Sequence, residues 1–137
     1  MASFWSEYLK HKVLDHMRGI ATWTPGATSF FCLMKAAPTP LGGGTEIVWP
    51  RLEANNNSTT WNAAIGGKNT NKLSFEFMTA APADLGVIVG IAEYDAGSGG
   101  NLLTYGDLTT PKTILTGMNF TVLAEAGQFT YIDDIAP

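Results

Sequence analysis

The segment GVIVGIAEYDAGSGGNLLTYGDLTTPKT, residues 86–113, predicts two β-strands joined by a glycine-rich turn. Apolar residues occupy both alternating faces of residues 86–94, which is typical of a strand that is covered on both sides. Residues 95–101 then supply the glycines and small polar residues that tolerate the positive φ of a tight turn. The apolar run resumes over residues 101–108. We therefore expect the segment to form a hairpin of a β-sheet protein.

Short strands bounded by turn residues are predicted on both sides of this hairpin. Leu73, Phe75 and Phe77 alternate with polar residues, which is the period of a strand with one solvated face. Counting the hairpin, eight candidate strands emerge: residues 28–34, 46–49, 59–64, 72–77, 86–94, 101–108, 119–125 and 128–132. Such a series favours a β-sandwich or jelly roll over an α/β enzyme. The expected fold is mainly β, a single-domain β-sandwich or jelly-roll-like fold over residues 1–137.

One α-helix is predicted at the N-terminus, over residues 3–18. Ser3 is a suitable N-cap, and Gly19 is a natural residue just beyond the C-terminus of a helix. Apolar side chains recur at every fourth position and form one stripe, Trp5, Leu9, Val13 and Met17. Residues 1–19 are thus expected to form a helical arm, and residues 27–137 the β-sandwich.

The composition argues against two classes of partner. The net charge is −4, and the eight Lys and Arg residues are dispersed, whereas binding to nucleic acid needs clustered cations. No run approaches the ~18 apolar residues of a membrane-spanning helix. Charged residues make up only 15% of the chain, against about 25% in a typical soluble domain. Other subunits are therefore expected to cover part of the surface, while nucleic acid and membrane are not expected partners.

Side chains suited to catalysis or metal binding are sparse. His11 and His16 are five residues apart, so a helix would turn them about 140° away from each other. Cys32 is the only cysteine and lies in an apolar run, which favours an inert buried thiol. Asp133 and Asp134 are interpreted as a polar C-terminal tail. No nucleotide-binding loop or GxSxG motif is present. The sequence predicts no catalytic, cofactor-binding or metal-binding residue, and no enzyme.

The tryptophans leave an alternative open. All four lie in the first half of the chain, where they could fill the core or anchor a protein interface: Trp5, Trp23, Trp49 and Trp61. If Trp49 and Trp61 were exposed, they could also stack on a carbohydrate. The polar partners of such a site would be Asn55, Asn56, Asn57 and Asn62.

Two segments of the chain resemble a family of small phage virion proteins known as tail fibre or head decoration proteins. Residues 4–19, with the sequence Leu14-Asp15-His16, are similar to the helical opening of these proteins. The hairpin carries the second part of the resemblance: Asp95, Ala96, Gly99, Gly100, Asn101, Leu102, Leu103, Tyr105, Gly106, Leu108, Thr109, Thr110, Pro111, Lys112 and Thr113. About half of the chain is covered, and the motifs mark a scaffold rather than a reaction.

The resemblance implies a non-enzymatic virion structural protein, made in the cytoplasm of the host bacterium. Tail fibres usually have longer chains with repeats or a shaft, so this short chain without repeats favours a head decoration or cement protein that binds and stabilises the outside of the capsid. The alternative is a tail fibre or tail adaptor component, and a carbohydrate-binding module is the third hypothesis. The expected partners are the major capsid protein or other virion proteins. A homo-oligomer is also expected, a trimer first and a dimer second.

Overall fold

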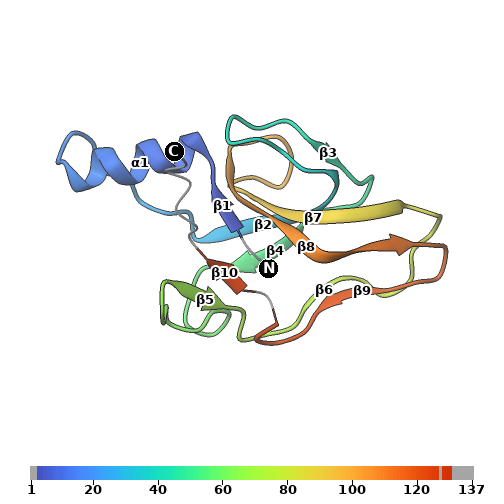
Figure 1. Cartoon of the computed structure of the whole chain (residues 1–137). Helices are drawn as coiled ribbons and strands as arrows, with labels where there is room; N and C mark the ends of the chain where they lie inside the picture. The colour runs from blue at the N-terminus through green and yellow to red at the C-terminus, as the bar shows by residue number, and fades with distance from the viewer. Residues whose placement is uncertain (1–2, 127, 131–137) are drawn as a thin grey trace.

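A computed structural model describes residues 3–126 and 128–130 of the chain. The expectation of a mainly β protein with a helix near the N-terminus is confirmed (Figure 1). The elements in chain order are β1 (Ser3–Trp5), α1 (Glu7–Met17), β2 (Thr28–Ala36), β3 (Thr45–Glu46), β4 (Leu52–Asn55), β5 (Lys68–Thr70), β6 (Phe75–Met78), β7 (Gly86–Tyr94), β8 (Leu102–Ile114), β9 (Phe120–Val122) and β10 (Gln128–Thr130).

The strands form one large sheet and two small ones, and every pairing is antiparallel. The large sheet has the order β1-β8-β7-β2-β3, and β4 also pairs with β2, beside its N-terminal half. The small sheets pair β5 with β10 and β6 with β9. In Figure 1 the β6–β9 pair lies across one face of the large sheet, which gives two layers consistent with a β-sandwich.

The main hydrophobic core fills the space between these layers. Phe31 and Leu33 of β2 and Ile88 and Ile91 of β7 point into it from the large sheet. The other layer contributes buried side chains from β6, from β9 and from the segment between β6 and β7: Phe75, Phe77, Met78, Ala81 and Phe120. Burial of these apolar side chains at roughly 1.5–3 kcal/mol each holds the two layers together.

A second, smaller core lies on the opposite face of the large sheet. Cys32 and Met34 of β2 alternate with the main-core residues of the same strand and pack with Ala92 and Leu102. β2 is therefore buried on both faces, and so is the C-terminal half of β7. The apolar pattern predicted this for all of residues 86–94, but Val87 in the N-terminal half is 46% exposed. The expectation of a buried Cys32 is confirmed, and burial raises the pKa of its thiol far above the usual range.

The predicted hairpin is present, and its turn is closed by a carboxylate. The Asp95 side chain accepts hydrogen bonds from the backbone N–H of Asn101 at 2.7 Å and from its side-chain amide at 2.9 Å. Gly99 and Gly100 have φ values of 62° and 75°, in the left-handed region that glycine adopts without strain. A Cβ atom at Gly100 would lie 2.5 Å from Asp95 Oδ1, so the turn requires glycine at this position.

β8 is longer than the predicted strand and runs on through Pro111 to Ile114. Proline cannot donate a backbone hydrogen bond, so it is normally excluded from the interior of a sheet. Here the register jumps from Gly90 opposite Asp107 to Ile88 opposite Lys112, which leaves Pro111 in a bulge without a paired residue. The bulge explains how the strand can continue past a proline.

Several predicted strand boundaries are wrong, because local turn hydrogen bonds compete with strand pairing. Residues 59–64 were expected to form a strand, but the Asn57 side chain accepts hydrogen bonds from the N–H groups of Thr59 and Thr60 and closes a turn instead. The predicted strand 46–49 is reduced to Thr45–Glu46, since a backbone hydrogen bond from Trp49 to Ile47 bends the chain. Strands β4 and β5 were not predicted.

Three other predicted strands begin or end at different residues. The strand expected over 72–77 is Phe75–Met78, and the strand expected over 119–125 is Phe120–Val122. The last predicted strand, 128–132, forms as Gln128–Thr130, and residues 131 and 132 lie outside the described part of the chain.

The predicted helix begins four residues later than expected. Ser3–Trp5 is a strand that pairs with Gly106, Tyr105 and Thr104 of β8. Ser6 is the N-cap in place of Ser3, and its hydroxyl accepts a hydrogen bond from Leu9 N at 3.1 Å. Gly19 follows the C-terminus with a φ of 71°, as predicted. The apolar stripe is only partly buried, because Leu9 is 6% exposed whereas Met17 is 67% exposed.

Arg51 connects the hairpin turn to the edge of the large sheet. Its guanidinium donates to the Glu46 carboxylate at 2.7 Å and to the carbonyl oxygens of Ala96 and Gly99 at 2.7 and 2.8 Å. The group also stacks on the Tyr94 ring, 3.9 Å from the ring centroid. Only 7% of the Arg51 side chain is exposed, although the Glu46 carboxylate is 34% exposed.

Leu9→Asp is expected to destabilise the protein by several kcal/mol, since it places an unpaired charge at a buried position and removes apolar burial. Leu14→Asp is the matched control, because Leu14 lies on the same helix and is 51% exposed. Urea denaturation of both variants measures the difference. Equal stability of the two variants would show that Leu9 does not hold α1 against the sheet.

Arg51→Ala is expected to lower the free energy of unfolding by about 2–4 kcal/mol, because two carbonyl groups and one carboxylate lose a charged donor. Arg18→Ala removes an exposed guanidinium and serves as the control. Thermal unfolding followed by circular dichroism compares the two variants. A loss in Arg51→Ala no greater than in Arg18→Ala would contradict a structural role for Arg51.

Candidate functional site: a groove walled by tryptophans

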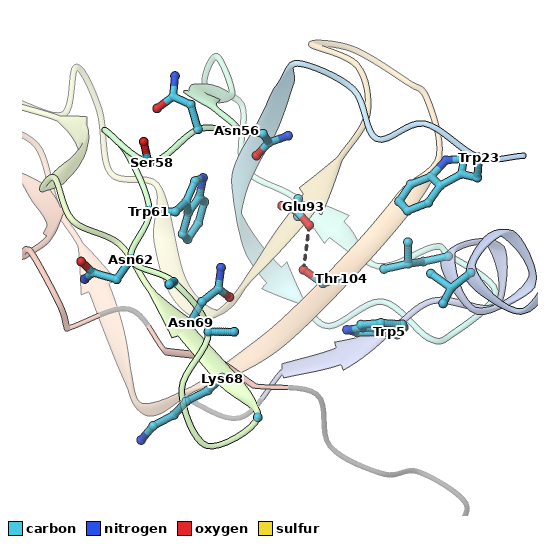
Figure 2. A pocket seen from close by; sticks show the side chains of 16 residues that line it. Trp5, Trp23, Asn56, Ser58, Trp61, Asn62, Lys68, Asn69, Glu93 and Thr104 are labelled. Carbon is cyan, nitrogen blue, oxygen red and sulfur yellow. Dashed lines mark hydrogen bonds between the residues drawn. The ribbon is translucent and has the colours of Figure 1, made fainter. Parts of the chain in front are cut away.

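An open groove of about 670 Å³ lies between α1 and the segment that leads from β4 to β5 (Figure 2). Its lining is mostly apolar and aromatic, with amide and carboxyl groups among the rings. The lining residues are Trp5, Leu9, Val13, Trp23, Asn56, Asn57, Ser58, Trp61, Asn62, Ala63, Ala64, Gly67, Lys68, Asn69, Glu93 and Thr104. Ligand pockets in proteins typically measure roughly 300–1,000 Å³ and combine these kinds of group.

One wall of the groove consists of Trp5, α1 and the loop that follows the helix. The start of α1 is held against β8, because Ser6 donates from its backbone N–H to the Leu103 carbonyl at 2.8 Å and from its hydroxyl to the Leu102 carbonyl. This contact falls where the β7–β8 register shifts beside Leu103. The bulge thus leaves a carbonyl available to position the helix.

Trp23 lies on the same side, on the loop between α1 and β2 (Figure 2). Its backbone N–H donates to His16 Nδ1 at 3.2 Å, which ties the loop back to the last turn of the helix. The Trp23 side chain is partly buried. The end of β1 and the loop after α1 therefore present two indole rings, Trp5 and Trp23, along one side of the groove.

Trp61 stands on the opposite side, and two core rings support it. Its ring centroid lies 5.8 Å from that of Phe31 and 5.3 Å from that of Phe75, the latter in an edge-on arrangement. The Trp61 backbone N–H donates to the Asn57 carbonyl at 3.0 Å. These contacts set the orientation of the indole before any ligand arrives.

The asparagines beside Trp61 divide into structural and available groups. The Asn56 amide donates to Gly26 O and Ser29 Oγ, and the Asn57 carboxamide oxygen caps its own turn. Asn62 donates to the Thr70 hydroxyl at 2.9 Å. The side-chain amide of Asn69 makes no hydrogen bond with another described residue, although it is half-buried among the groove residues.

Glu93 and Thr104 form the floor. Thr104 Oγ1 donates to Glu93 Oε1 at 3.2 Å (Figure 2). Burial raises the pKa of the Glu93 carboxyl above its ordinary value, and the hydrogen bonds from Ser29 and Thr104 offset this only in part. Glu93 is the only carboxyl group among the described residues that line the groove, and Lys68 is the only ammonium group.

The structure brings together part of the carbohydrate-binding set that the sequence suggested. Trp61, Asn56, Asn57 and Asn62 line the groove, whereas Asn55 does not. Trp49 is also absent from the lining: it packs against the main core, and its indole N–H donates to the Phe77 carbonyl at 2.8 Å. Trp49 is therefore a structural residue.

The histidines do not form a site together. His11 Nε2 lies 3.3 Å from Glu7 Oε2, while His16 accepts a hydrogen bond from Trp23. Over residues 3–126 and 128–130, no group of three or more His, Cys, Asp or Glu side chains is placed to hold a metal ion. In the same residues, none of the helical segments has the length and apolar character of a membrane span. Asp133 and Asp134 lie outside the described residues.

Sequence reasoning missed Glu93, Thr104 and Asn69. Glu93 occupies a position with the same orientation as Ile91 on the inward face of β7, and a charged residue in that pattern is a signal that the sequence does contain. Asn69 gives no such signal, because residues 66–69 contain two glycines and have the composition of a turn. Its place beside Trp61 depends on the bridge between Trp61 and Asn71 and on the hydrogen bond from the Asn62 N–H to the Thr70 carbonyl.

The family comparison agrees with a phage structural protein. Residues 4–130 match the model of the family described as Podophage GP4 fiber I protein gp80, so the chain belongs to this family of phage fibre proteins. No curated protein matches the chain. The match supports the virion as the location and extends the resemblance seen at residues 4–19 and in the hairpin to nearly the whole chain.

Glu93→Gln is expected to make the protein more stable than the wild type at neutral and alkaline pH. Because the folded state raises the pKa of Glu93, it holds the proton more tightly than the unfolded state, and wild-type stability falls as pH rises above the ordinary value of 4.5 towards the raised one. Glutamine keeps a hydrogen-bonding group and never ionises. The gain in melting temperature should therefore grow with pH across this window and be small below it.

Glu53→Gln is the control for Glu93→Gln, because it removes an exposed carboxylate from β4. Thermal melts of both variants and the wild type at several pH values test the effect. A Glu93→Gln protein whose stability follows the wild type at every pH would contradict a buried, proton-binding Glu93.

Proposed function

We propose that this protein is a non-enzymatic fibre subunit of the phage tail. The observation that carries the proposal is the match of residues 4–130 to a podophage fibre family. The head position was favoured by the short chain without shaft repeats. The match to a family described as fibre proteins supports the tail position instead.

Self-association of the subunit is part of the proposal. A short chain can extend into a fibre only through contacts with other subunits, and its low charged content of 15% suits a surface that is partly covered. The far end of α1 projects away from the sheets in Figure 1 and exposes Leu14, Met17 and Ile20. These side chains are suitable for an interface. A trimer is the first expectation and a dimer the second, since identical subunits usually close with rotational symmetry.

The groove supports binding rather than hydrolysis. Glycoside hydrolases generally use two carboxyl groups about 5–9.5 Å apart. Glu93 is the only carboxyl group among the described lining residues, and its hydrogen-bond partners are hydroxyl groups rather than a second acid. This arrangement can hold a ligand but lacks the second acid of the usual hydrolytic pair.

Immunogold labelling of intact particles, viewed by electron microscopy, should place this protein on the tail. An antibody against the major capsid protein is the control, because it marks the head under the same conditions. Particles that lack the subunit should keep their heads at normal heat resistance. Label confined to the head, together with heads that rupture at lower temperature without the subunit, would overturn the tail assignment and support a decoration protein.

A further inference from the structure

We propose that the groove between α1 and the β4–β5 segment binds a neutral saccharide of a bacterial surface glycan, with sugar rings against Trp23 on one side and Trp61 on the other, above a polar floor. This inference deepens the proposed function and rests on it, because a fibre at the tail is the part of a particle that meets the cell surface. The binding chemistry itself belongs to the isolated subunit and can be tested on it.

The walls suit the apolar faces of a sugar ring. A pyranose presents C–H groups on its faces and hydroxyl groups around its edge, and rigid aromatic side chains offer large contact area to such faces at low entropic cost. Trp23 and Trp61 come from opposite sides of the groove, and Trp5 lies below Trp23 (Figure 2). Sugar rings of a short saccharide can therefore stack on indole at either side of the groove.

The floor suits the hydroxyl groups at the edge of the ring. The Asn69 amide offers donors and an acceptor that no described residue occupies, and it lies close to Trp61 (Figure 2). Glu93 offers carboxyl oxygens, of which Oε1 already accepts from Thr104. Sugar hydroxyls both donate and accept, so they can satisfy amide and carboxyl groups at once. Convergent polar groups in an aromatic groove provide the selectivity of a small-molecule site.

The site is assembled before a ligand binds. Core rings hold Trp61, and Asn56 fixes the chain beside it through Gly26 and Ser29. Ser6 fixes the start of α1 on β8. Little ordering is therefore needed on binding, and preorganisation of this kind raises affinity by reducing the entropic cost.

Charge determines which sugars fit. Glu93 lies at the floor of the groove and would repel the carboxylate of an acidic sugar, while Lys68 lies on the β5 strand at its rim (Figure 2). A neutral hexose or N-acetylhexosamine avoids this repulsion. The polar floor also argues against a purely apolar protein segment as the occupant, because such a segment would leave the Asn69 amide and the Glu93 carboxyl buried without new partners.

The test uses the purified chain and ligand-observed NMR with glucose, galactose, rhamnose and N-acetylglucosamine, and with glucuronic acid as the acidic control. At least one neutral sugar should bind with a dissociation constant in about the millimolar range or tighter, and glucuronic acid should bind more weakly. Trp23→Ala and Asn69→Ala should each weaken the binding by about tenfold or more. Asn55→Ala is the matched control, since Asn55 is exposed outside the groove, and should bind like the wild type.

Thermal melts followed by circular dichroism distinguish a loss of binding from a loss of folding. Both variants should melt near the wild-type temperature, because Trp23 lies on a loop and Asn69 makes no side-chain hydrogen bond with a described residue. No binding by any neutral sugar, or binding that survives both substitutions, would overturn the glycan site. Protection of the groove by another virion protein in assembled particles would overturn it as well. The two proposals fail separately. A protein that binds no sugar but is labelled on the tail would overturn the glycan site and leave the fibre proposal standing. A protein that binds sugar but is labelled on the head would overturn only the fibre proposal.

Discussion

The whole structure depends on β7, which is paired on both edges and is covered on both faces over its C-terminal half. β2 and β8 hydrogen bond to its two sides, while Ile88 and Ile91 enter the main core and Ala92 enters the smaller one. A strand in this position cannot shift by one residue without turning apolar side chains to the wrong face. Its neighbours are therefore fixed in register, and the two bulges of β8 are the places where that register is allowed to change.

The groove is a consequence of this fixed frame. Glu93 and Thr104 face each other because β7 and β8 are paired there, and Ser6 finds a carbonyl acceptor because β8 bulges at Leu103. The core that β7 organises also supplies Phe31, on which Trp61 rests. The same hydrogen-bond ladder that stabilises the sheet thus sets the separation between the two aromatic walls. A carboxyl group on the inward face costs stability when it ionises, and such a cost is more often accepted at a binding surface than in a plain core.

Membership of a fibre family fits a subunit whose sandwich, helix and groove have different roles. The sandwich provides a rigid body, α1 carries exposed apolar side chains outward, and the groove lies between the two. Arg51 ties the hairpin turn to the sheet edge through short hydrogen bonds, so the turn whose sequence carried the resemblance is also a fixed part of the frame. The family match describes the chain as a fibre protein without assigning any role to the groove.

The sequence by itself determined the elements whose hydrogen bonds and burial are local or periodic. The apolar runs of β2 and β7 favour buried strands, and the glycines of the hairpin turn and Gly19 after the helix suit a positive φ; the structure has all of these. Tertiary structure decided the segments in which long-range contacts compete with local conformational preference. Ser3–Trp5 became a strand because β8 offers an edge, Asn57 closed a turn where a strand was predicted, and Trp49 entered the core while Trp61 reached the groove. The physical reason is that partners far apart in the sequence, such as Ser6 and Leu102 at a separation of 96 residues, compete with local preference, and only the folded chain brings them together.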